Sequence, residues 1–388
     1  MTKRVFLDYA ATAPQLPEVH ELLLSEAVVK LGNASTLYLE GRLARQDLEQ
    51  ARQDLAATLG CSPESLFFCS GGTEAAGTLI EGIARGCLEK SGPKRARMHI
   101  ICAAFEHHAV LDSVLALKHL GYQIDLLRPR PDGRIEPESL AACLRPDTLM
   151  VVVMLAQNEL GTIMDVERLS QVAHAGGALF MSDCVQAFSK LPIDLAVMGI
   201  DAASFSAHKI GGPYGMGAFY LRPTLPFLAR QLGGGQERKL RSGTQDVPSA
   251  MAFALAAKIA TAKLANGEAQ RLASLRDDLQ ALLIAGSNRI RSTVAIAAAD
   301  VDTHLPGHLH LLVEGIESQT MVLKLDELGF AVSGGAACSS SSLEPSHVLM
   351  SMGISKDAAY GALRITLGRE STPADCARFA EALLAILA

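Results

Sequence analysis

The sequence predicts an α/β protein with a mostly parallel sheet, helices on both faces of that sheet, and a smaller α+β domain. Two observations carry this prediction. Short, continuously apolar runs such as LMVVVMLA at 149–156 alternate with longer amphipathic stretches over the first two-thirds of the chain. This pattern is typical of parallel strands that are buried on both faces. The chain also has 388 residues, which allows two to three domains at roughly 150 residues each.

The expected strands of the sheet each lead into a helix or a turn. Ser65–Cys69 precedes a helical pattern over Thr73–Lys90, and Met98–Ala103 precedes one over Ala109–Leu120. The next expected strands, in chain order, are Leu149–Ala156, Ala178–Ser182, Ala202–Phe205 and Ala218–Leu221. The glycine-rich segment 211–217 separates the last two, so we expect two neighbouring strands joined by a turn.

The rest of the chain predicts the smaller domain. One long helical stretch, about Pro248–Ile284, would lead out of the large domain. The elements expected after it are strands at Ser292–Ala297 and Leu309–Glu314 and helices near Thr320–Leu328 and Pro373–Leu387. We therefore predict a large domain over residues 14–256 and a small domain made of 1–13 and 257–388. The small domain would carry a mobile cysteine-containing loop at about 332–345.

Composition and charge exclude several classes of protein. Apolar residues make up 49% of the chain, which excludes wholesale disorder. The net charge of −6 argues against nucleic acid as the main partner. We expect no membrane partner and a cytoplasmic location, because the longest strongly apolar run is strand-sized and the N-terminus lacks a secretory signal. The eight cysteines form no CxxC pair, so we expect reduced thiols and no metal site on the protein alone.

Polar side chains follow the expected strands at the point where each strand ends. In chain order they are Ser70-Gly71-Gly72-Thr73-Glu74, His107 and His108, Gln157-Asn158-Glu159, Asp183 and Gln186, and Ser206, His208 and Lys209. The carboxyl ends of parallel strands meet at one edge of a sheet, which is where ligands bind in such folds. Their shared position therefore predicts a binding site at this edge.

The first of these groups, SGGTE at 70–74, is expected to open a helix. Its two glycines let the backbone approach a ligand, and the first N–H groups of a helix favour an anion such as phosphate. An ordinary N-cap formed by Ser70 or Thr73 is an equal alternative. Nucleotide motifs do not match, because no Gly-Lys-Ser/Thr follows SGGTE and GGPYGMG at 211–217 lacks the GxGxxG spacing.

Four residues, two of them among the strand-end residues above, suit covalent or charge-based chemistry. Lys209, at a strand end, is either a Schiff-base amine or a solvated turn lysine. Asp183 follows a buried strand and would pair with a pyridinium nitrogen, as in pyridoxal phosphate sites, or with an arginine. Cys338 lies between glycines and four serines, which indicates an exposed segment, whereas the other seven cysteines fit strand or helix patterns and core packing. Arg364 suits capture of a carboxylate, or equally a surface charge on a strand.

Together these segments resemble the cysteine desulfurases of the NifS/IscS type, which are pyridoxal 5'-phosphate enzymes of the class-V aminotransferase family. The resembling motifs cover nearly the whole chain in order: FLDYAAT (6–12), SGGTE (70–74), FEHHAV (105–110), QNELG (157–161), SDCVQAFSKLPID (182–194), SFSAHKIGGPYG (204–215), RSGT (241–244) and GGAACSSSSLEPSHVLMSMG (334–353). The resemblance implies a large domain like that of aspartate aminotransferase and a long, mobile cysteine loop.

The resemblance implies a role for each matching residue. Lys209 would form the Schiff base with pyridoxal phosphate and move protons, His107 would stack on the ring and assist proton transfer, and Cys338 would be the nucleophile. Further cofactor contacts would come from Gly72, Thr73, Asn158, Asp183 (ring nitrogen), Gln186 (ring hydroxyl), Ser206, His208 and, from the neighbouring subunit, Thr244. Substrate contacts would come from Asn33, Asn158 and Arg364.

The implied reaction converts L-cysteine to L-alanine and leaves the sulfur on Cys338 as a persulfide. A homodimer would pass this sulfur to an acceptor protein for iron–sulfur cluster assembly or tRNA thiolation, and Cys338 could ligate a cluster shared with a scaffold. A selenocysteine lyase or another enzyme of the class-V aminotransferase family is the alternative. A non-catalytic sulfur carrier or scaffold is the remaining class.

The chain departs from the family pattern at three places. The segment GNASTLYLEG at 32–41 stands where the family often has a longer one with a histidine, which bears on Asn33. Tyr214 stands where a lysine is common, and we expect it to be a surface change. The chain also ends soon after its last expected helix, without the tail that some members use with a scaffold.

Overall fold

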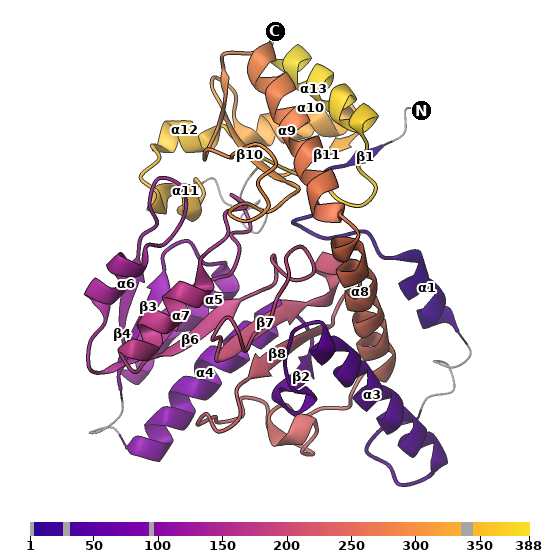
Figure 1. Ribbon diagram of the computed structural model, residues 1–388, viewed down its shortest axis with the longest axis vertical. Helices are drawn as coiled ribbons and strands as arrows, with labels where there is room; N and C mark the ends of the chain where they lie inside the picture. Colours follow the sequence, from indigo (N-terminus) through magenta and orange to yellow (C-terminus); the bar gives the residue numbers. More distant parts are fainter. Residues whose placement is uncertain (1–3, 26–31, 93–96, 335–343) are drawn as a thin grey trace.

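Figure 1 shows the computed structural model, which describes residues 4–25, 32–92, 97–334 and 344–388. A seven-stranded sheet forms its centre. Its strands, in spatial order, are β2 (Leu66–Cys69), β8 (Gly217–Leu221), β7 (Ala202–Ser206), β6 (Leu179–Asp183), β5 (Thr148–Val152), β3 (His99–Ala103) and β4 (Gln123–Leu127). β8 runs antiparallel to both of its neighbours, and the other pairs are parallel. The predicted mostly parallel sheet is confirmed, as is the pair of adjacent strands around the 211–217 turn.

Helices cover both faces of this sheet because successive residues of a strand point to opposite sides. In β3, Ile100 and Cys102 belong to one hydrophobic cluster, whereas Ile101 and Ala103 belong to another. The helices that pack on the first face are α4 (Gly72–Ser91) and α5 (His108–Ala116), the latter continued by η2 (Leu117–Leu120). The helices on the second face are α3 (Leu39–Ala57), α6 (Pro137–Cys143), α7 (Val166–Ala175) and α8 (Val247–Ala265).

α8 is long and apolar enough to cross a membrane by length and composition, with 19 residues and a mean hydropathy of 1.3. The expectation from the sequence concerned only uninterrupted apolar runs, which are strand-sized, and so did not single out α8. The helix packs against α3 and against α1 (Pro17–Leu24). Phe253 and Ala257 are fully buried in the core, and Lys258 pairs with Asp54 of α3 at 3.3 Å. These contacts make α8 a core helix of the sheet domain.

The single long helix expected over 248–284 is two helices. α8 ends at Ala265, and α9 (Glu268–Gly286) begins after Asn266 and Gly267. Gly267 has a φ of +87°, a left-handed conformation that glycine adopts at little cost. The Asn266 side chain donates to the carbonyl of Ala262 at 2.9 Å and so holds the end of α8. Apolar periodicity continues across this break, which is why the pattern predicts one helix.

Two smaller sheets lie at the top of Figure 1. One is antiparallel, with the order β12 (Ala362–Thr366), β10 (His308–Val313) and β9 (Ile290–Ser292). The other pairs β1 (Val5–Phe6) with β11 (Phe330–Ala331) in parallel. The remaining helical segments are α10 (Ser318–Glu327), α11 (His347–Ser351), α12 (Lys356–Tyr360), α13 (Pro373–Leu387), η1 (Pro63–Ser65), η3 (Ala207–Ile210) and η4 (Glu237–Lys239).

Most of the expected C-terminal elements are present, but the strand expected over 292–297 is wrong. β9 instead ends at Ser292, where the chain turns into an irregular segment. Val5 and Leu7 share a hydrophobic cluster with side chains between Leu275 and Leu387. This packing favours the grouping of residues 1–13 with 257–388, and the domain boundaries stay a prediction.

Candidate active site

A cavity of about 410 Å³ opens at the carboxyl edge of the large sheet. Arg364 of β12 and His347 of α11 enter it from the region of the smaller sheets. Arg364 was predicted from the sequence and His347 was not. The remaining predicted residues that line the cavity follow the ends of β2, β3, β5, β6 and β7, and they are Gly72, Thr73, His107, Asn158, Asp183, Gln186, Ser206, His208 and Lys209. The expected convergence of strand-end side chains is therefore present, and what each would contact in a ligand stays a prediction.

Lys209 is held by the N-terminal segment that follows β1. Its Nζ donates to the carbonyl oxygens of Ala10 at 2.7 Å and Ala11 at 2.8 Å. Gln186 shares the first of these acceptors, because its Nε2 donates to Ala10 at 2.8 Å. The other end of the amide, Oε1, accepts from Lys190 Nζ at 2.9 Å. Lys209 is therefore a positioned amine and not a solvated turn lysine.

Arg364 is buried, so the alternative of a surface strand charge is wrong. Its Nη2 donates to Asp8 Oδ1 at 2.9 Å, and its Nη1 donates to the carbonyl of Asn158 at 3.0 Å. Its Nε is buried without a partner among the described residues. A guanidinium fixed on two sides in this way, with a donor to spare beside a cavity, suits a carboxylate ligand.

Asp183 ends β6 and is buried. Its Oδ1 accepts from the Val185 amide and the Ser204 hydroxyl, both at 3.0 Å, and it forms no ion pair with an arginine in the described part of the chain. Burial raises the pKa of Asp183, and its hydrogen bonds and His107 oppose that rise. A cationic ligand atom would relieve this cost of burial, which favours the ring-nitrogen role over the structural ion pair.

His107 is the N-cap of α5, and its Nδ1 accepts from the Ala109 amide at 3.1 Å. Burial lowers the pKa of His107. Because Nδ1 is an acceptor, the neutral ring carries its proton on Nε2. A neutral imidazole with a fixed tautomer suits proton exchange with a ligand.

The start of α4 also lines the cavity, through Gly72 and Thr73. Gly71 is its N-cap and provides no capping side chain, so the alternative of an ordinary cap from Ser70 or Thr73 is wrong. A Cβ on Gly72 would lie 2.9 Å from Val185 Cγ2, so this helix start is closely packed against the neighbouring strand end. Uncapped N–H groups next to the Thr73 and Ser206 side chains form a cradle for an anion.

His208 borders this cradle, and its Nδ1 lies 3.1 Å from the Thr12 hydroxyl. Burial, together with Lys209 and Lys190, lowers the pKa of His208 to about 4. The ring of Tyr214 stacks on His208 with centroids 5.8 Å apart, and its hydroxyl accepts from Thr12 Oγ1 at 3.3 Å. Tyr214 is 67% exposed and does not line the cavity, so the surface change expected from the sequence is confirmed.

Several residues of the site had no assigned role in the sequence. Glu106 is fully buried, and its Oε1 accepts from the Met154 amide at 2.6 Å. Burial and the nearby Asp183 raise the pKa of Glu106 well above its usual range. His347 lines the cavity, contacts the Glu106 carbonyl through Nε2 at 2.9 Å and packs against the His108 ring. The sequence could have indicated both residues, because Glu106 lies within the motif FEHHAV and His347 within the motif SLEPSHV.

Two predicted residues of the described chain, Asn33 and Thr244, do not line this cavity. Asn33 is exposed in the turn before α3, where its Oδ1 accepts from the Ser35 amide at 2.9 Å. Thr244 is also exposed, in a loop held to α4 by the Arg241–Glu74 ion pair of 2.8 Å. Cys338 lies outside the described residues.

The other seven cysteines are buried or half-buried as free thiols, in agreement with core packing. The expectation that all of them lie in strands or helices is wrong for Cys61, which lies between α3 and η1, and for Cys184, which directly follows β6. Burial raises the pKa of Cys61 and of Cys69 to about 12. These thiols are therefore poor nucleophiles at neutral pH.

The doubly covered sheet, with a held lysine and a buried carboxylate at its carboxyl edge, defines an α/β enzyme of the fold-type I class. The family model for class-V aminotransferases matches residues 5–379. An IscS-like cysteine desulfurase from Mycobacterium tuberculosis (strain ATCC 25618 / H37Rv) is 40% identical over 375 residues, which cover 95% of this chain and 93% of that protein.

Two solved structures are also similar. A NifS-like protein has a TM-score of 0.88 and 31% identity, and the match covers 99% of each chain. SspA in complex with cysteine has a TM-score of 0.79 and 29% identity, over 94% of this chain and 98% of that one. The chain therefore belongs to the class-V aminotransferase family, in which it resembles the cysteine desulfurases of the NifS and IscS type.

Proposed function

We propose that this protein is a pyridoxal-phosphate-dependent cysteine desulfurase that releases L-alanine from L-cysteine and passes the sulfur to an acceptor. The observation that carries the proposal is one cavity wall shared by Lys209, His107, Asp183 and Arg364. An amine, a proton-exchanging imidazole, a buried carboxylate and a guanidinium are the groups that this reaction on an amino acid requires.

The residues present fit pyridoxal phosphate. The uncapped start of α4, with Thr73, Ser206 and His208, would hold the phosphate, and Asp183 would face the ring nitrogen. Gln186 would donate its remaining amide hydrogen to the ring hydroxyl, because its Oε1 already accepts from Lys190. The cavity of about 410 Å³ lies within the usual range of roughly 300–1,000 Å³ for such ligands. When bound, the cofactor supplies an electron sink for the substrate carbons.

The side chains of the chain would bind the substrate and move its protons. Arg364 would bind the carboxylate of L-cysteine with Asn158 beside it, and Lys209 would exchange the proton at Cα. His107 would exchange a second proton through Nε2. The Cys338 thiolate would attack the substrate sulfur, so that a sulfur–sulfur bond forms while the carbon–sulfur bond breaks and its electron pair stays on the carbon side.

The partners follow from this reaction. L-cysteine is the substrate, and the reported complex of SspA with cysteine supports that choice. In a homodimer, Thr244 of each subunit would contact the cofactor of the other. An acceptor protein for iron–sulfur assembly or tRNA thiolation would take the persulfide sulfur in the cytoplasm. Cys338 would also ligate a cluster shared with a scaffold protein. The described residues contain no group of three or more His, Cys, Asp or Glu side chains that could hold a metal ion. A selenocysteine lyase is the second candidate, because the same pocket would accept selenium in place of sulfur.

The test is product formation by the purified enzyme with L-cysteine and a reductant. We expect alanine and sulfide in equal amounts, and a much lower specific rate of alanine release from cysteine in Lys209→Ala. Lys258→Ala, which removes an exposed lysine of α8, is the matched control and should keep the activity. Turnover of L-selenocysteine without turnover of L-cysteine would support the second candidate. Alanine release by Lys209→Ala at the full rate would contradict the assignment.

A further inference from the structure

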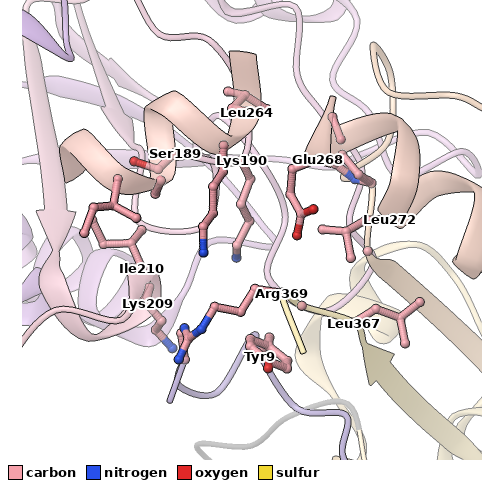
Figure 2. A pocket seen from close by; sticks show the side chains of 18 of the residues that line it. Tyr9, Ser189, Lys190, Lys209, Ile210, Leu264, Glu268, Leu272, Leu367 and Arg369 are labelled. Atoms are coloured by element: carbon pink, nitrogen blue, oxygen red, sulfur yellow. The ribbon is translucent and has the colours of Figure 1, made fainter. Parts of the chain in front are cut away.

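A second cavity, of about 110 Å³, lies next to the candidate active site (Figure 2). Lys209 borders both cavities. The second one is enclosed by η3, by the break between α8 and α9, and by the segment that follows β12. Its walls are mainly apolar, and the large apolar side chains that line it are Leu16, Ile210, Ile259, Leu264, Leu272 and Leu367.

Positive charge exceeds negative charge around this second cavity. Lys190, Lys209, Lys263 and Arg369 line it, and Figure 2 shows the charged end of Arg369 beside that of Lys209. Glu268 is the one carboxylate among the described lining residues. Arg271 already neutralises that carboxylate through two hydrogen bonds of 2.6 and 2.7 Å. Arg369 pairs with the exposed Glu370 at 3.3 Å, and the four cations still outnumber the two nearby carboxylates. An apolar cavity with an excess of cations favours an anion that also has an apolar part.

Lys190 connects the two cavities. It lines the second cavity, and its Nζ donates to Oε1 of Gln186, which lines the first, at 2.9 Å. An anion that draws Lys190 toward the second cavity would lengthen this hydrogen bond. The Gln186 amide would then lose the contact that fixes its orientation toward the active site.

We propose that the second cavity binds a small aliphatic monocarboxylate and that its binding is transmitted to the active site through Lys190 and Gln186. At roughly 10–15 Å³ per water-sized position, the cavity has room for a ligand of about ten non-hydrogen atoms. The carboxylate would lie between Lys190, Lys263 and Arg369, and the aliphatic part against the leucine and isoleucine walls. The binding itself does not depend on the proposed reaction.

The protonation of Lys190 makes the binding depend on pH. Burial, with Lys209 and Arg364 nearby, lowers the pKa of Lys190 to about 7. The other charged or titratable groups around it are Tyr9, His208, His308, Lys263, Glu268 and Arg369. Burial and neighbouring cations lower the pKa of His208 to about 4 and that of His308 well below its usual range, so both histidines stay neutral above pH 6. A bound carboxylate would stabilise protonated Lys190, so binding would take up protons and weaken above pH 7.

Isothermal titration of the purified holoenzyme with hexanoate tests the binding. We expect saturable binding that is about tenfold weaker at pH 8.5 than at pH 6.5 and is accompanied by proton uptake at pH 7.5. Hexanamide and inorganic phosphate should bind much more weakly. Equal binding of hexanamide would show a purely apolar site, and equal binding of phosphate a general anion site, and either result would overturn the proposal.

Variants locate the site. Lys263→Gln should weaken hexanoate binding by roughly threefold or more, whereas Lys258→Gln, on the same helix but paired with Asp54, should leave it unchanged. Lys190→Met should abolish the proton uptake. Arg364→Gln should keep the binding, because Arg364 lines only the first cavity. Loss of binding in Arg364→Gln, or full binding in both Lys263→Gln and Lys190→Met, would place hexanoate elsewhere and refute the proposal.

The connection to the active site has its own readout. Hexanoate should shift the visible absorbance of the bound cofactor in the unmodified enzyme and should leave that of Lys190→Met unchanged. Binding with no spectral shift would refute the connection. Because neither measurement uses cysteine turnover, a failure here is distinguishable from a failure of the proposed function.

Discussion

Asp8 and Arg364 form an ion pair of 2.9 Å although 356 positions separate them in the chain. Asp8 belongs to the segment that follows β1, and Arg364 lies in β12. The same N-terminal segment accepts hydrogen bonds from Lys209 and Gln186 at the Ala10 carbonyl. A few residues near the N-terminus thus hold the proposed substrate-binding cation and the proposed catalytic amine in one place.

Replacing Asp8 with Asn should weaken substrate binding more than it slows the reaction. The neutral amide cannot hold the Arg364 guanidinium as strongly, and a charge-assisted hydrogen bond of about 1.5 kcal/mol corresponds to a rise in KM of about tenfold. Steady-state kinetics with L-cysteine would measure it. Asp326→Asn, which removes an exposed carboxylate paired with Arg4, is the control. A changed kcat with an unchanged KM would argue against this positioning role for Asp8.

Asp183→Asn should keep the fold and lower the turnover with L-cysteine by at least about a hundredfold, because a neutral amide cannot stabilise a positive ring nitrogen. The carboxylate is buried, and its hydrogen bonds to Val185 and Ser204 can be kept by the amide oxygen. The measurement combines turnover with the thermal unfolding temperature of the variant. Unchanged turnover would support a structural role for Asp183 instead.

Cys338→Ser should separate cofactor binding from sulfur transfer. The cofactor should remain bound, because Lys209, Asp183 and Arg364 are unchanged, whereas persulfide formation should vanish, because a serine hydroxyl is far less acidic than a thiol. Mass spectrometry after incubation with L-cysteine would locate the added sulfur. The seven other cysteines serve as internal controls. Persulfide on any of them, or persulfide that persists in the variant, would contradict the proposed nucleophile.

Stability should fall as the pH drops from 6.5 to 4. Burial lowers the pKa of His310 to about 3 and that of His304 to about 4, so the unfolded chain binds protons in this window that the folded chain does not. Each such group costs up to about 1.4 kcal/mol of unfolding free energy per pH unit. Urea unfolding at several pH values would measure the slope, and His310→Gln should reduce it. An identical slope in the variant would exclude His310 as a contributor.

Six of the seven strands of the large sheet could be predicted from the sequence, and the edge strand β4 could not. Continuous apolar runs such as 149–156 predict buried parallel strands, and the polar residues that directly follow them predict the edge where they converge. Asp183, Ser206 and Lys209 all line the cavity for this reason. Each of these residues lies at or just after the end of a strand, and that position can be predicted from the order of residues along the chain.

Other features of the site and fold depend on tertiary packing and could not be predicted from the sequence pattern. The break at Asn266–Gly267 is invisible in the apolar periodicity of α8 and α9, and the burial of Arg364 was open because a strand cation looks the same in a core or on a surface. The contacts Asp8–Arg364 and Ala10–Lys209 fix the orientation of the site, and both depend on how elements pack. Contacts between residues hundreds of positions apart leave no local periodicity, because they follow from how the apolar faces of the sheets and helices bury one another.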